Sequence, residues 1–120
     1  MEELKLCESE YRFASIAWEN EPIGSGELVK LCEQELGWKK STTYTVLKKL
    51  CERGVLKNDN ATVTSLIKQE QVQKFESRQF INRTFQGSLP GFITAFMGDK
   101  KLSRQQADEL KKLIDSYKEE

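Results

Sequence analysis

Small hydroxyl side chains and lysines are concentrated between Gly37 and Asn58, in the stretch GWKKSTTYTVLKKLCERGVLKN. Hydroxyl groups can donate to or accept from the edges of DNA bases, and threonine methyl groups can touch thymine. Lysines can reach phosphate oxygens and fix the register of a protein on a duplex. The stretch therefore predicts a DNA-binding surface made of Lys39, Lys40, Ser41, Thr42, Tyr44, Thr45, Lys48, Lys49 and Lys57. A simpler interpretation, a solvated helix surface, stays open on these residues alone.

The positive charge of the chain is local. The 120 residues contain 19 Lys and Arg and 19 Asp and Glu, so the formal net charge is zero. Residues 1–37 nevertheless carry a net charge of −6, and residues 38–57 carry +5. Because salt screens charges beyond about 10 Å at 0.1 M, the local field decides whether a polyanion is attracted. A nucleic acid partner is therefore compatible with a neutral chain.

The composition argues against catalysis and metal binding. The chain has no histidine, the commonest general base and metal ligand. Cys7, Cys32 and Cys51 form no CxxC pair, so neither a zinc site nor a disulfide framework is expected, and a reducing cytoplasm fits best. No window approaches the roughly 18 apolar residues of a membrane span. We predict a cytoplasmic protein that is not an enzyme, with no cofactor, metal, small-molecule substrate or membrane insertion.

Three helices and a hairpin are expected to position the hydroxyl-rich stretch. Apolar residues recur at helical spacing over 8–20, between Ser25 and Gly37, and over roughly 40–53. Two β-branched runs then flank the turn-forming sequence Asn58-Asp59-Asn60, which predicts a β-hairpin. This order indicates a winged helix-turn-helix within a mainly α fold. A generic three-helix scaffold with an incidental hairpin is the alternative.

A second helical region follows the hairpin. Five of the six phenylalanines lie between Phe75 and Phe96, and a tail of about fifty residues does not readily bury so much aromatic surface by itself. A second copy of the tail would cover it; folding back onto the N-terminal domain is the alternative. We predict a winged-helix DNA-binding domain over residues 1–67 and a helical dimerisation domain over residues 68–120. The expected dimer contacts are Phe75, Phe85, Leu89, Phe92, Ile93, Phe96, Leu110, Leu113 and Ile114.

Several short motifs occur in a specific order along nearly the whole chain. In WENEPIGSGELVKLCEQELGWKKSTTYTVLKKLCERGVL, Trp18 ends the first helix and Trp38 precedes the third, and Thr42, Thr45 and Leu47 form a Thr-x-x-Thr-x-Leu motif. The tail contains QGSLPGFITAFMGDKKLS. Together these motifs resemble the BlaI, MecI and CopY family, the penicillinase, methicillin-resistance and copper-responsive repressors of bacteria.

The resemblance implies a cytoplasmic homodimer that binds a palindromic operator in double-stranded DNA and represses nearby genes. It also implies a pathway in which a membrane-bound sensor protease leads to cleavage of the tail between Ala95 and Phe96. Ala95 stands where the best-known members have asparagine. The cysteine cluster that binds metal in the copper-responsive members is absent from this tail.

A second class of function stays open. The wing sequence NDNATVTS has one charged residue, Asp59, and the first 37 residues are acidic. Both features would suit a winged-helix module that binds another protein rather than specific DNA. A DNA reader must show salt-dependent affinity for duplex DNA, whereas a protein-binding module need not.

Overall fold

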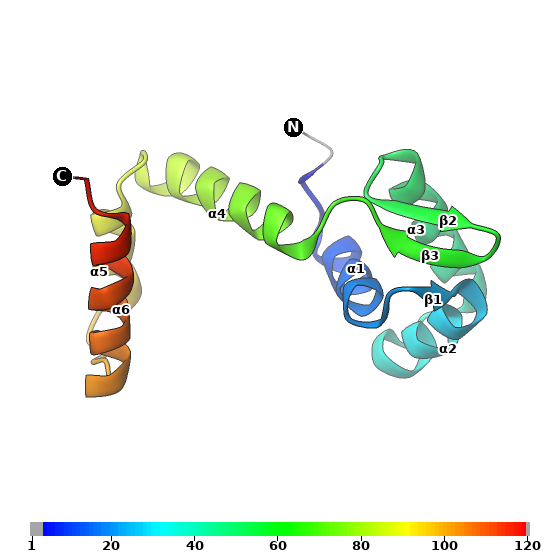
Figure 1. The fold of residues 1–120 in the computed structure, drawn as a ribbon, viewed down its shortest axis with the longest axis horizontal. Helices are drawn as coiled ribbons and strands as arrows, with labels where there is room; N and C mark the ends of the chain where they lie inside the picture. Colours follow the sequence, from blue (N-terminus) through cyan, green and yellow to red (C-terminus); the bar gives the residue numbers. More distant parts are fainter. Residues whose placement is uncertain (1–3, 120) are drawn as a thin grey trace. The chain divides into compact units, whose positions relative to one another are not determined.

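The computed structural model describes residues 4–119, and within them it has six helices and a three-stranded antiparallel sheet (Figure 1). In chain order the elements are α1 (Glu8–Asn20), β1 (Ile23–Gly24), α2 (Ser25–Leu36), α3 (Lys40–Glu52), β2 (Leu56–Asp59), β3 (Thr62–Ser65), α4 (Gln69–Phe85), α5 (Leu89–Met97) and α6 (Arg104–Tyr117). This mainly α architecture with a small sheet confirms the predicted fold class, a winged helix followed by a helical region.

The chain divides into two compact units, the first ending at Phe80 and the second beginning at Ile81. The division falls inside α4, because the first turns of this helix contribute to the core of the first unit. Val72 of α4 is fully buried there. The sequence-based boundary after residue 67 concerns function rather than packing, and it stays a prediction.

One hydrophobic core holds the first unit together. Each helix of the winged helix and the hairpin contributes a fully buried side chain: Phe13 from α1, Leu28 from α2, Leu50 from α3 and Val63 from β3. Burying a side chain of this size stabilises by roughly 1.5–3 kcal/mol. The packing therefore fixes the rotation of α3 about its axis and leaves the opposite face of that helix exposed.

The sheet contains one strand that the sequence did not predict. Its strand order is β1-β3-β2, and β1 pairs antiparallel with β3, with Ile23 opposite Val63. A two-residue strand has no periodicity to detect. Its pairing nevertheless ties the loop before α2 to the wing.

The hairpin turns two residues later than predicted. Asp59 pairs with Thr62, so the loop consists of Asn60 and Ala61, and Asn58 belongs to a strand rather than to the turn. Both loop residues have positive φ, 54° and 64°. Two-residue hairpin loops of this kind match the twist of the flanking strands, which is why the turn forms here although Ala61 is a poor residue for it.

Replacing Ala61 with glycine should stabilise the first unit. Alanine in the left-handed region costs about 1 kcal/mol that glycine does not, less the extra unfolded-state entropy of glycine. We expect a gain of about 0.5–1 kcal/mol in urea unfolding followed by tryptophan fluorescence. The two tryptophans, Trp18 and Trp38, both lie in the first unit. Asn60→Gly is the matched control and should gain less, because asparagine tolerates this conformation. A loss of stability in Ala61→Gly would contradict the assignment of strain.

Two contacts anchor the exit of the hairpin to α1 and the loop after it. The indole Nε1 of Trp18 donates to the carbonyl oxygen of Ile67 at 3.0 Å. The Glu21 carboxylate accepts from the backbone N–H and the hydroxyl of Ser65, each at 2.7 Å, and pairs with Lys68 at 3.5 Å. Burial would raise the pKa of Glu21, but the Ser65 hydrogen bonds and the Lys68 charge hold it below its ordinary value. The wing is thus fixed within the first unit.

The second unit contains two capped helices that pack few of their apolar side chains. The hydroxyl of Ser88 accepts from the Gly91 N–H at 2.9 Å at the start of α5, and the hydroxyl of Ser103 accepts from the Gln106 N–H at 3.1 Å at the start of α6. Within the described residues, neither helix has a buried side chain. Their apolar faces are therefore available to a partner.

Candidate nucleic-acid interface

The exposed face of α3 carries the hydroxyl groups predicted to read DNA. At about 100° per residue, Ser41, Thr45 and Lys48 lie on the side opposite the buried Leu47 and Leu50. All three are exposed. Thr42 is also exposed and lies at one margin of this face, while Thr43, one residue on, is fully buried. The structure thus brings together the small polar side chains that the sequence singled out on this helix.

Three lysines near this face have no acidic partner among the described residues: Lys39 and Lys40 at the N-terminal end of α3, and Lys48 on the face itself. Lys39, Lys40 and Lys48 are exposed, and none forms an ion pair within residues 4–119. Lys39 is the N-cap of α3 and Lys40 is its first residue, where positive charge opposes the helix dipole by about 0.3–1 kcal/mol each. A placement that costs stability is expected where charge serves binding rather than folding.

Tyr44 joins the exposed face to the start of α2. Its hydroxyl lies 3.4 Å from the hydroxyl oxygen of Ser25, and the Ser25 N–H donates to the carbonyl oxygen of Ala61 at 2.8 Å. The side chain remains 37% exposed. Tyr44 therefore lies beside the α2 N-terminus, and it is the Ser25 backbone that bonds the wing turn. The place of Tyr44 among the DNA contacts stays a prediction.

Lys49 differs from the other predicted lysines because it has an acidic partner. Its Nζ lies 3.0 Å from Glu10 Oε2, and Arg53 Nη1 donates to Glu10 Oε1 at 3.2 Å. Burial would raise the pKa of Glu10, but the Cys7 backbone N–H and Lys49 lower it to about 2. Lys49 therefore neutralises a buried carboxylate, and we leave it out of the surface proposed below.

The wing contributes one basic residue. Lys57 is exposed on β2, where it pairs with Thr64 of β3. Asp59 follows two residues later on the same strand. The wing is thus a weak source of positive charge, because its strand β2 carries one lysine and one aspartate. Most of the predicted basic contacts without an acidic partner in the described chain come from α3 and its N-cap.

The predicted dimer residues lie mainly on exposed helix faces of the second unit. In α5, Leu89 and Phe96 are 57% and 60% exposed, and in α6 Leu113 and Ile114 are 54% and 62% exposed. Ile93 and Leu110 are also exposed.

Phe92 is half-buried, with its ring 5.5 Å from that of Phe85 and 5.7 Å from that of Phe96. The two helices therefore carry several large apolar side chains that remain to be covered. Phe75, on α4 in the first unit, is half-buried.

Ala95 and Phe96, the predicted cleavage position, lie within α5 and are both exposed. Phe96 packs on Phe92 and lies 5.8 Å below the Lys100 ammonium group. The peptide bond between Ala95 and Phe96 is part of a helix, so a protease would reach it only after local unfolding of α5.

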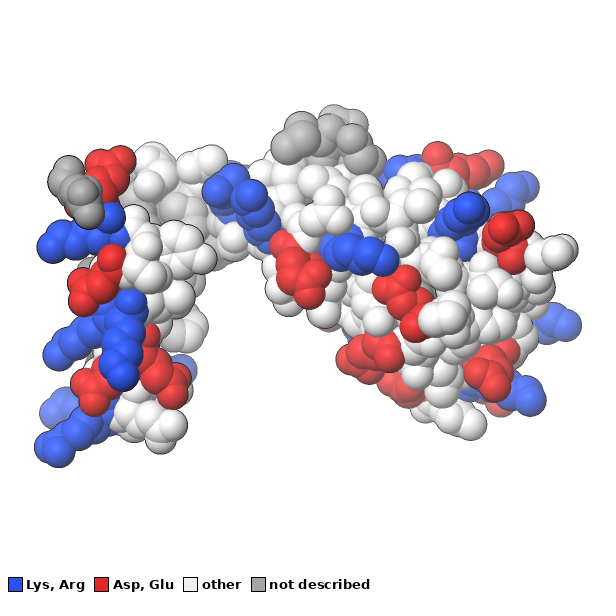
Figure 2. Space-filling view, viewed as in Figure 1, with Lys and Arg blue, Asp and Glu red and all other residues white. Residues whose placement is uncertain are grey.

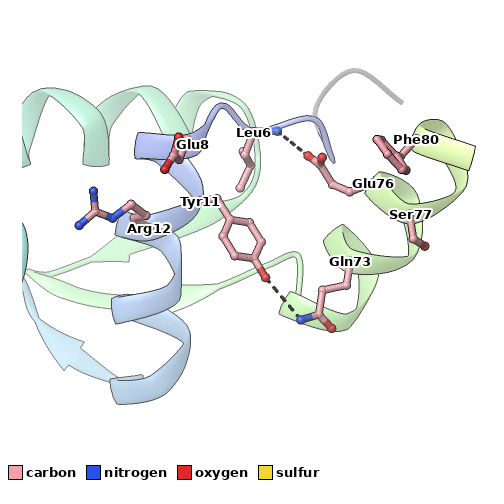
Figure 3. Close-up of a pocket in the computed structure, with 8 residues that line it drawn as sticks. All are labelled: Leu6, Glu8, Tyr11, Arg12, Gln73, Glu76, Ser77 and Phe80. Atoms are coloured by element: carbon pink, nitrogen blue, oxygen red, sulfur yellow. Dashed lines mark hydrogen bonds between the residues drawn. The ribbon is translucent and has the colours of Figure 1, made fainter. Parts of the chain in front are cut away.

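A cleft lies between α1 and α4 in the first unit. It encloses about 630 Å³ and is lined by Leu6, Glu8, Tyr11, Arg12, Gln73, Glu76, Ser77 and Phe80 (Figure 3). The Tyr11 hydroxyl accepts from Gln73 at 3.4 Å, and Arg12 points away from α4. The polar groups of the cleft thus do not converge on a common point, as those of a small-molecule site would.

Other surfaces offer less to a nucleic acid or a metal. On the face shown in Figure 2, acidic and basic side chains intermix along α6, so this face presents no continuous basic surface. Among the described residues, no group of three His, Cys, Asp or Glu side chains could hold a metal ion. No helix in that part of the chain is long and apolar enough to cross a membrane.

Two residues near this surface have roles that the sequence did not predict. Ser25 is the first residue of α2, after the N-cap Gly24, and it links Tyr44 to Ala61. Glu10 lies in the first turn of α1, and nothing local in the sequence indicates that it meets Lys49. Both roles depend on contacts between residues far apart in the chain.

Comparison with known proteins adds an independent observation. The model of a family described as penicillinase repressor matches residues 6–116. The chain is similar to the penicillinase repressor of Bacillus licheniformis, with 22% identity over 118 residues, 95% of this chain and 92% of the relative. It is also similar to the methicillin resistance regulatory protein MecI of Staphylococcus aureus strain Mu50 (21% identity) and of Mammaliicoccus sciuri (20% identity), each over 114 residues, 92% of this chain and 93% of the relative.

Proposed function

Because the chain belongs to the penicillinase repressor family, we propose that it represses transcription as a homodimer bound to a palindromic operator in double-stranded DNA. The family consists of transcriptional repressors, which are not enzymes. Membership therefore confirms the resemblance found in the sequence and the prediction that the chain is not an enzyme. The operator, the dimer and the mode of release are the parts that we propose.

The exposed face of α3 is the observation that carries the proposal. Ser41, Thr42 and Thr45 are small enough to let the helix approach base edges in the major groove, and Lys39, Lys40 and Lys48 are unpaired cations beside them. Phosphate contacts position a protein on DNA, and base contacts select the sequence. In the proposed complex, the lysines hold the backbone and the hydroxyl-bearing residues read the bases.

Lys48→Ala should weaken binding to all duplexes alike. The loss of one phosphate contact per subunit should lower the slope of log affinity against log salt by about 0.9 per subunit. Fluorescence anisotropy with an operator duplex and a scrambled duplex, each from 50 to 300 mM salt, would measure both effects. Lys49→Ala is the matched control, because Lys49 pairs with Glu10; it should change the salt slope much less while lowering stability. Equal slopes for the two variants would contradict the assignment.

The apolar faces of α5 and α6 support a dimer of two such chains. Exposed apolar patches of this kind on a soluble chain usually mark interaction sites, and a second copy would place the same side chains on both sides of the contact. Two copies of α3 would then reach half-sites about one helical turn apart on a palindrome. Dimerisation is thus proposed as the source of both affinity and operator symmetry.

Release of the repressor is proposed to follow cleavage of α5 between Ala95 and Phe96, downstream of a membrane sensor protease acting in the cytoplasm. The cut would separate Phe96 and the whole of α6 from the rest of the chain, and with them much of the exposed apolar surface. Mass spectrometry of the protein from cells exposed to a β-lactam should then reveal a fragment that begins at Phe96. An intact chain in derepressed cells would argue against this route.

A protein-binding module remains the second candidate because the wing offers only Lys57 as a basic residue. This alternative predicts an affinity for duplex DNA that is weak and shows no sequence preference. The salt titration described for Lys48 separates the two functions.

A further inference from the structure

Thr45 occupies the centre of the exposed face of α3. At about 100° per residue, it lies roughly 160° around the helix from Leu47 and 140° from Leu50, the buried side chains that fix the helix. Ser41 precedes it by one turn and Lys48 follows it by nearly one turn. A helix lying in a groove on this face would bring Thr45 close to the bases.

The hydroxyl group of Thr45 is already used by the helix itself. Its Oγ1 donates to the carbonyl oxygen of Ser41 at 2.9 Å. A hydroxyl has one hydrogen to donate, so in this arrangement Thr45 cannot donate to guanine or to the O4 of thymine. What the exposed side chain still offers to a ligand is its methyl group and the two lone pairs of the hydroxyl oxygen.

The neighbouring hydroxyl groups differ from that of Thr45. The side chains of Ser41 and Thr42 are exposed and donate no hydrogen bond within residues 4–119. They keep both their donor and their acceptor capacity for a ligand. Thr43 is buried and bonds the Lys39 carbonyl oxygen at 3.3 Å, so it is not available. The four small hydroxyl residues of α3 are therefore not equivalent.

We propose that Thr45 selects a thymine in each half-site through contact between its methyl group and the C5-methyl group of the base. The inference rests on the proposed function, since it specifies what one residue of the α3 surface recognises. The major groove displays the thymine methyl as the apolar feature that distinguishes this base. A threonine whose hydroxyl is bonded within the helix is suited to that contact and unsuited to reading a base as a donor.

The test compares thymine with uracil, which lacks only the C5-methyl group. A half-site is first selected from random duplexes, and each thymine is then replaced in turn by deoxyuridine in a synthetic palindrome. At one position per half-site we expect the wild-type protein to lose about fourfold or more in affinity, the value of about one buried methyl group. Thr45→Ala should bind the thymine and uracil duplexes equally at that position.

Two further variants separate the methyl group from the hydroxyl group. Thr45→Val keeps a methyl group without the hydroxyl and should preserve the discrimination between thymine and uracil. Thr45→Ser keeps the hydroxyl without the methyl and should lose it. The opposite result, discrimination retained by serine and lost by valine, would overturn the proposal. It would also be overturned if the wild-type protein bound every uracil-substituted duplex as tightly as the unsubstituted palindrome. If the selection enriches no sequence at all, the proposed function itself fails, and the inference with it.

Discussion

Replacing Phe96 with aspartate should convert the protein to a monomer and lower its affinity for a palindromic operator by about 10²- to 10⁴-fold, the gain that linking two binding modules commonly provides. Phe96 is 60% exposed on α5 and packs on Phe92. In a dimer its ring would be covered, and a carboxylate there would have to be buried without a partner. Ile114→Asp on α6, at 62% exposure, should act in the same way.

Sedimentation velocity measures the mass, and anisotropy with whole and half operators measures the affinity. Gln105→Asp is the control, because Gln105 lies on α6 about 180° from Ile114 and about 140° from Leu110 and is exposed. This variant should remain dimeric. Tryptophan fluorescence should show an unchanged unfolding curve in all three variants, since both tryptophans are in the first unit. A Phe96→Asp and an Ile114→Asp protein that both remain dimers would place the interface elsewhere.

Replacing Glu10 with glutamine should lower the free energy of unfolding of the first unit by about 3 kcal/mol at pH 7. Glu10 is 5% exposed, and its carboxylate lies between Lys49 and Arg53. Its pKa is lowered from 4.5 to about 2, and each unit of such a shift corresponds to about 1.4 kcal/mol. Glutamine keeps an acceptor for the Cys7 N–H but removes the charge that the two cations face.

The pH dependence of stability gives the same prediction a second readout. Because the pKa of Glu10 is lower in the folded state, its contribution is complete above pH 4.5 and is lost as the pH falls toward 2. Glu10→Gln should therefore lose less stability than the wild type between about pH 5 and pH 2. Glu33→Gln is the control, because Glu33 is exposed on α2; its stability should be close to that of the wild type. Identical pH profiles for wild type and Glu10→Gln would contradict the role of this ion pair.

The helices of the winged helix could be predicted because their signals are local. The apolar spacing of α1 and the left-handed C-cap at Gly37, with φ of 70°, are encoded within a few residues. The same holds for Ser103 as the cap of α6. The apolar stripes of α5 and α6 could also be read as faces in need of a partner, since periodicity alone defines a face.

Contacts between distant residues could not be predicted. Lys49 looked like its neighbour Lys48, and only the meeting of the α1 N-terminus with the C-terminal part of α3 shows that it pairs with Glu10. The two-residue strand β1 exists because β3 is beside it. The hydrogen bond of Thr45 to Ser41 is the opposite case: it follows a pattern known for threonine in helices, so it could have been expected from the sequence.

Selection of random duplex DNA by the purified protein at near-physiological salt, followed by sequencing, tests the central claim most directly. Repression by a symmetric dimer through α3 predicts one enriched palindrome with half-sites about one helical turn apart, and enrichment that is lost when Phe96→Asp replaces the wild type. Recovery of unrelated sequences, bound no better than the starting pool, would contradict the account and favour a winged helix that binds protein.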